Sequence, residues 1–69
     1  MYCVVVYDSV GVKIVLMSFA SLRDAFAYAR FWRKGHREYS DADVFIEVHG
    51  GRGAVLVGDI GAVAAQLTR

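Results

Sequence analysis

The sequence has 69 residues, of which 57% are hydrophobic, and its charged residues leave a formal net charge of +1. This length suffices for one domain, residues 1–69, with a thin margin of stability. The near-neutral charge excludes a whole-molecule preference for nucleic acid or acidic partners, and the lone Cys3 excludes a disulfide scaffold and favours a reducing compartment. We therefore expect a cytoplasmic protein.

The hydrophobic content exceeds the roughly 45–50% that is usual for globular domains. A core of this size cannot bury all of these apolar side chains, so we expect a membrane or a partner to cover the rest. A membrane-spanning segment is not expected, because Lys13, Arg23 and Arg30 interrupt the N-terminal half before about 18 apolar residues accumulate. A signal peptide is not expected either, since no basic region precedes Tyr2–Tyr7. The remaining explanation is that a partner protein covers the exposed apolar surface, and we expect this partner to be a second copy of the chain.

Two β-branched and aromatic runs open the chain, Tyr2–Asp8 and Val12–Phe19. The turn residues Ser9, Val10 and Gly11 separate them, so the two runs predict a β-hairpin.

A helix is predicted from Leu22 to about Lys34, with Gly35 as its stop. Ser21 can cap the free N–H groups at its start, and Asp24 suits the positive end of the helix dipole. At about 100° per residue one arc of this helix is apolar and faces the core. The arc consists of Leu22, Ala25, Phe26, Ala29 and Trp32.

Strand character returns at Val44–Val48, where alternation places Phe45, Glu47 and His49 on one face. The glycine-rich segment 50–53 predicts a tight turn into a fourth strand, Ala54–Val57. Ala62–Leu67 forms a short terminal helix or frays. The order strand–strand–helix–strand–strand predicts an α+β fold, an antiparallel sheet of about four strands with one main helix on one face.

Both faces of this predicted sheet are apolar, yet one helix can cover only one of them. The uncovered face therefore predicts a two-fold homodimer. The residues expected in that dimer interface are Val5, Tyr7, Val15, Met17, Phe19 and Phe45.

The outer face of the helix is basic, because Arg30 and Lys34 each lie within roughly 20° of Arg23. Such a face grips phosphates or an acidic protein surface, or is a solvated face with cations near the helix C-terminus. Aromatic residues away from the buried arc are typical of interface hot spots. The expected partner-facing set is Arg30, Phe31, Lys34, Arg37 and Tyr39.

Catalytic and cofactor signals are weak in this sequence. Glu47 and His49 could orient a general base, but no nucleophile or oxyanion loop accompanies them, so we interpret them as a structural polar pair. The segment 50–53 leads into a strand instead of a helix, which favours a hairpin turn over a phosphate loop. The spacing of His36, Asp41, Asp43 and His49 matches no metal-ligand pattern. We expect no enzyme, cofactor or metal.

Two resemblances add to this interpretation. The segments Asp24-Ala25-Phe26-Ala27-Tyr28-Ala29-Arg30 and Phe45-Ile46-Glu47-Val48-His49-Gly50, with Gly53, resemble a small uncharacterised bacterial domain that has no established activity. In size and element order the chain resembles phage-encoded inhibitors of bacterial host factors, including some anti-CRISPR proteins. That fold-level likeness implies a non-enzymatic, often dimeric protein that blocks a host factor in the bacterial cytoplasm.

The sequence therefore predicts a dimeric binding protein that docks on a host protein or complex and inhibits or modulates it. The alternative is a small nucleic-acid-binding module that uses the basic helix face.

Overall fold

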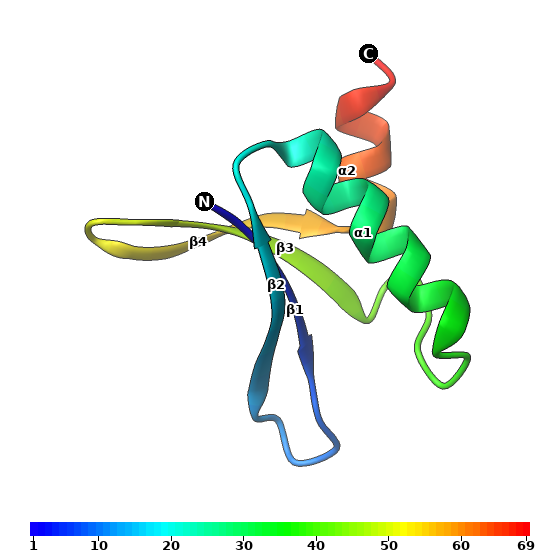
Figure 1. Ribbon diagram of the computed structural model, residues 1–69. Helices are drawn as coiled ribbons and strands as arrows, with labels where there is room; N and C mark the ends of the chain where they lie inside the picture. Colours follow the sequence, from blue (N-terminus) through cyan, green and yellow to red (C-terminus); the bar gives the residue numbers. More distant parts are fainter.

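The computed structural model describes residues 1–69 and has the expected α+β fold (Figure 1). Four strands form one antiparallel sheet in the order β2-β1-β3-β4, and two helices lie against it. The elements are β1 (Tyr2–Tyr7), β2 (Lys13–Phe19), α1 (Leu22–Gly35), β3 (Val44–Gly50), β4 (Gly53–Asp59) and α2 (Ile60–Leu67). None of its helices has the length and apolar character needed to cross a bilayer.

The first hairpin turns around Asp8, which the sequence placed in the first strand but which lies outside β1. Its Oδ1 accepts from the backbone N–H groups of Val10 and Val12, at 2.9 and 2.8 Å. Gly11 adopts a φ of +86°, which few other residues tolerate. An aspartate that bonds the backbone two residues ahead favours a turn over a strand, so β1 ends at Tyr7 and β2 begins at Lys13.

Helix α1 begins where its cap predicts. The Ser21 side chain accepts from the N–H of Asp24 at 3.1 Å, which satisfies one of the free donors at the helix start. At the other end, the N–H of His36 donates to the carbonyl of Arg33. The His36 ring stacks on Trp32 with centroids 3.9 Å apart.

The C-terminal segment forms a complete short helix, which begins earlier than the sequence predicted. Asp59 caps α2 by accepting from the N–H of Ala62 at 2.8 Å. Strand β4 accordingly continues through Gly58 and Asp59, beyond Val57, where the sequence predicted its end. Because Ile60 and Val63 are buried, α2 extends the cover that α1 provides.

One hydrophobic core lies between the helices and one face of the sheet. The strands, α1 and α2 all contribute to it, so both helices cover the same face (Figure 1). The buried members are Val4, Val6, Ala25, Ala29, Val44, Ile46, Ile60 and Val63. The opposite face of the sheet, which we call the open face, carries no helix, and the turn ends of both hairpins extend beyond the helical layer (Figure 1).

A β-bulge in β2 corrects one detail of the predicted alternation. Val4 pairs with Met17 and Val5 with Val15, so Leu16 is an extra residue that packs toward the core. The bulge reverses the facing of the residues that follow it. Phe19 therefore lies on the helix side, where its ring is 5.4 Å from that of Tyr28. It does not lie on the open face.

Candidate protein-binding surface

The outer side of α1 presents an exposed aromatic side chain beside two cations. Phe31 is 75% exposed, the largest exposure of any aromatic residue in the chain. It lines a shallow depression together with Phe26, Ala27, Arg30 and Lys34. We call these five residues the α1 surface. Three predicted partner-facing residues, Arg30, Phe31 and Lys34, are therefore brought together.

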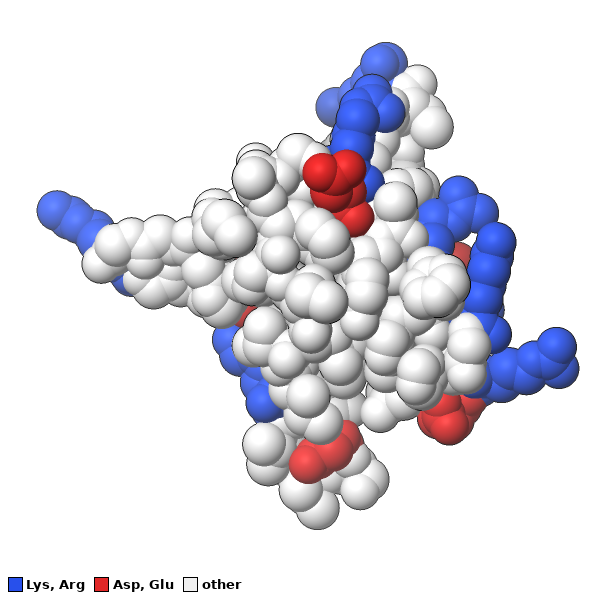
Figure 2. Space-filling model, viewed as in Figure 1, with Lys and Arg blue, Asp and Glu red and all other residues white.

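The cations of the α1 surface have no carboxylate partners. The ion pairs of the chain join Lys13 to Glu47 and Arg33 to Asp41, and the His49 ring also contacts Glu47. Arg30 instead lies over the Phe26 ring, 5.6 Å from its centroid. In Figure 2 the middle of the molecule is largely uncharged, while Lys and Arg atoms gather along the margin formed by α1. Unpaired cations beside an exposed aromatic residue suit an acidic, partly apolar partner.

The other two predicted partner-facing residues lie elsewhere. Arg37 is exposed in the loop that follows α1. Tyr39 is half-buried, packs against the core and has its ring 5.0 Å from that of Trp32. Its structural role was missed because the loop sequence around it is polar.

Tyr39 also lines a second depression, at the turn end of the first hairpin. The aromatic residues Tyr7 and Phe45 line it too, in edge-to-face contact with centroids 5.9 Å apart. Its carboxylates are Asp8, Glu38 and Asp43. The near-zero net charge thus conceals a separation, with unpaired cations on α1 and carboxylates around this depression.

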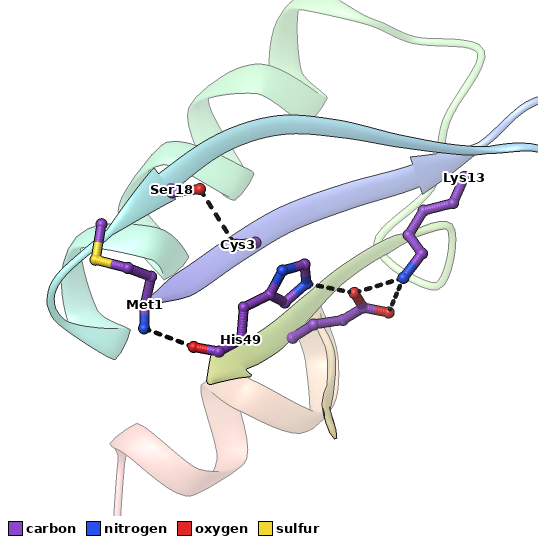
Figure 3. A network of polar contacts seen from close by, with 6 residues as sticks. Met1, Cys3, Lys13, Ser18 and His49 are labelled. Carbon is purple, nitrogen blue, oxygen red and sulfur yellow. Dashed lines mark hydrogen bonds and ion pairs between the residues drawn. The ribbon is translucent and has the colours of Figure 1, made fainter. Parts of the chain in front are cut away.

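On the open face a polar network crosses three strands (Figure 3). Lys13 donates to both carboxylate oxygens of Glu47, at 2.9 and 3.2 Å, and Nε2 of His49 lies 2.9 Å from Oε1. Glu47 is 6% exposed. The predicted Glu47–His49 pair is therefore confirmed, and Lys13 is a third member that sequence separation concealed.

The side chains of this polar network cover the centre of the open face. Lys13 pairs with Tyr7 and Glu47 pairs with Cys3, so the Lys13 side chain crosses β1 at the level of Val5. Val5 is fully buried, and Cys3 is 3% exposed with its Sγ 3.1 Å from Ser18 Oγ (Figure 3). Val5, which was predicted to lie in the dimer interface, has no exposed surface to offer.

Burial and ionic partners act on the Glu47 pKa in opposite directions. Burial alone would raise the pKa of Glu47, but the hydrogen bonds from His49 and Lys13, with their charges, together hold it below its ordinary range. The same contact raises the pKa of Lys13. Both residues are therefore charged at neutral pH, and none of the depressions of the surface is lined by Glu47 or His49.

Around this network the open face remains apolar. Tyr7, Val15 and Leu56 are 42%, 50% and 59% exposed, and Phe45 is half-buried beside Tyr7. Met17, predicted for the dimer interface, is 46% exposed but pairs with Val4 of the core, so the bulge places it on the helix side of the sheet and not on the open face. Tyr7, Val15 and Phe45, predicted for the dimer interface, therefore share one face, and Leu56 joins them from β4 because it pairs with Glu47.

The glycine-rich segment and the candidate metal ligands have no functional site around them. Gly50 pairs with Gly53 across a two-residue turn, and Gly53 has a φ of +110°, so the predicted glycine-rich hairpin is confirmed. No group of three or more His, Cys, Asp or Glu residues is placed to hold a metal ion. No protein-family model, curated protein or solved structure matches this chain.

Proposed function

We propose that this chain is a non-enzymatic protein-binding module that docks on a host protein through its α1 surface and thereby inhibits or modulates it. The observation that carries the proposal is the exposure of Phe31 beside Arg30 and Lys34. Burying a phenylalanine side chain contributes about 1.5–3 kcal/mol, and aromatic and arginine side chains dominate protein interfaces.

Two-fold self-association is the second part of the proposal. Val15, Leu56 and Tyr7 form an apolar rim around a polar centre on the open face, which no helix covers. A dimer formed there would leave α1 accessible on each copy, since α1 packs on the opposite face of the sheet. Such an arrangement presents two docking surfaces to one partner complex.

Affinity capture from a bacterial lysate tests the docking surface, with the wild-type chain compared with Phe31→Ala and Lys34→Gln. The matched control is Val10→Ala, because Val10 is an apolar side chain with 80% exposure in the first hairpin turn. We expect a captured protein to be lost with Phe31→Ala, reduced with Lys34→Gln and retained with the control. Equal capture by Phe31→Ala and the wild type would refute the assignment.

Nucleic-acid binding is the alternative function, and the unpaired cations of α1 favour it. Arg23, Arg30 and Lys34 are exposed on one helix and take part in no ion pair. Three phosphate contacts would give log affinity a slope of about −3 against log salt concentration. A gel-shift titration with duplex and single-stranded oligonucleotides measures this slope, and an absence of any salt-sensitive shift would exclude the alternative.

A further inference from the structure

A groove between α1 and α2 adjoins the α1 surface and shares Phe26 and Arg30 with it. It has a volume of about 240 Å³ and is more apolar than polar. Arg23, Phe26 and Arg30 line it from α1, while Ala64, Leu67 and Thr68 line it from the end of α2. The sequence alone did not indicate this groove, because it depends on where α2 packs.

The two arginines give the groove a specific charge. Neither Arg23 nor Arg30 takes part in an ion pair, and no carboxylate lines the groove. The apolar residues Phe26, Ala64 and Leu67 therefore lie beside two arginines that form no ion pair. A complementary occupant has one large apolar side chain and acidic groups on either side of it.

The spacing of the arginines indicates the form of that occupant. Arg23 and Arg30 are seven residues apart, which is two turns or about 10 Å along the axis of α1. Glutamates seven residues apart on another helix have the same separation, and a leucine between them on the same face points between the arginines. A helix laid in a groove between two helices is an established mode of peptide recognition.

We propose that the α1–α2 groove binds an acidic amphipathic helix of the partner protein, with an apolar residue seated on Phe26 and Leu67 and acidic residues at Arg23 and Arg30. This inference rests on the proposed function for the existence of a protein partner. It assigns a second contact region next to the α1 surface, since Phe26 and Arg30 line both.

A synthetic helical peptide with the pattern Glu-x-x-Leu-x-x-x-Glu is the probe, titrated into the isotopically labelled chain and followed by NMR. We expect shifts of the backbone amides of Arg23, Ala64 and Leu67. A peptide with Lys in place of both Glu residues should not bind. Shifts confined to other parts of the chain, or equal binding of the Lys peptide, would overturn the proposal.

Charge variants of the chain provide the second arm. The double variant Arg23→Gln/Arg30→Gln should bind the Glu peptide about fivefold more weakly, the effect of two exposed ion pairs. The control is Arg52→Gln, which removes one exposed arginine in the turn between β3 and β4. Equal affinity of the double variant and the control would overturn the proposal.

A third measurement distinguishes a peptide from a nucleic acid in the groove, and it distinguishes failure of this proposal from failure of the proposed function. An oligonucleotide that shifts the groove amides more strongly than the Glu peptide does would overturn the peptide assignment. Failure of the groove leaves the proposed function intact if Phe31→Ala still abolishes partner capture. Conversely, loss of the Phe31 effect with retained peptide binding refutes the α1 surface and supports the groove.

Discussion

The ammonium group of Lys13 on β2 donates to both carboxylate oxygens of Glu47 on β3, although β1 lies between these two strands. Glu47 is buried, so its carboxylate depends on Lys13 and His49 for hydrogen bonds. We predict that Lys13→Met lowers the midpoint of urea unfolding, because it leaves a buried carboxylate with one donor. Lys13→Arg should preserve most of the stability. A Lys13→Met variant as stable as the wild type would show that the contact has no net effect.

Stability should decrease at acidic pH. The pKa of Glu47 is below its ordinary value of about 4.5 in the folded chain, so its contribution is complete above that value and is lost as pH falls through the folded pKa. Hydrogen bonds from Ser40, chiefly from its backbone N–H and also from its hydroxyl, lower the pKa of Asp43. Asp43 therefore also contributes stability that is lost as the pH falls through its folded pKa. Urea midpoints between neutral and strongly acidic pH measure the loss. Glu47→Gln and Asp43→Asn should each flatten the profile, and an unchanged profile in both would contradict the assignment.

Gly58 should tolerate no side chain, because α2 lies directly against it. A Cβ at this position would be 2.9 Å from the Cβ of Ala62, and its φ of +156° disfavours other residues. We expect Gly58→Ala to lower the free energy of unfolding by about 1–3 kcal/mol. Gly51→Ala is the control, since its Cβ would meet nothing within 4 Å, and it should be close to neutral. Similar urea midpoints for both variants would contradict this packing.

Adjacent residues of β4 test self-association through the open face. Leu56 pairs with Glu47 on the open face, whereas Val55 pairs with Val48 on the helix side, and both are largely exposed. Leu56→Lys should shift the chain toward monomer in sedimentation velocity, while Val55→Lys should leave the oligomeric state of the wild type unchanged. A wild-type chain that sediments as a monomer over a wide concentration range would rule out this dimer.

Tyr39 should affect stability more than partner binding. Its ring packs on Trp32 and against the core, so Tyr39→Ala should lower the free energy of unfolding by about 1–3 kcal/mol. Tyr39→Phe keeps the ring and should restore most of that loss. Thermal unfolding measures both variants. If Tyr39→Phe unfolds as easily as Tyr39→Ala, the ring packing does not account for its role.

Local signals predicted most of this fold. Ser21 capped the helix as its position indicates, and alternation in β3 placed Glu47 and His49 together. Asp59 followed by an apolar run carried the signal for α2, but the glycines on either side of it favoured a break. The capping hydrogen bond to Ala62 shows which preference prevailed.

Features that depend on long-range pairing could not be predicted. The bulge at Leu16 has no local sequence signal, yet it moves Phe19 to the helix side. The Lys13–Glu47 contact joins residues 34 positions apart and requires the strand order. The α1–α2 groove likewise arises only when α2 packs beside α1. These contacts decide which apolar residues remain exposed.

Site-specific photo-crosslinking from position 31 tests docking through the α1 surface most directly. A photoreactive phenylalanine analogue replaces Phe31 in one chain and Val10 in a control chain, and both are expressed in bacterial cells. A discrete protein adduct from position 31, absent from position 10 and lost when Lys34→Glu is added, is the predicted result. Identical adducts from both positions, or none from position 31, would contradict the account.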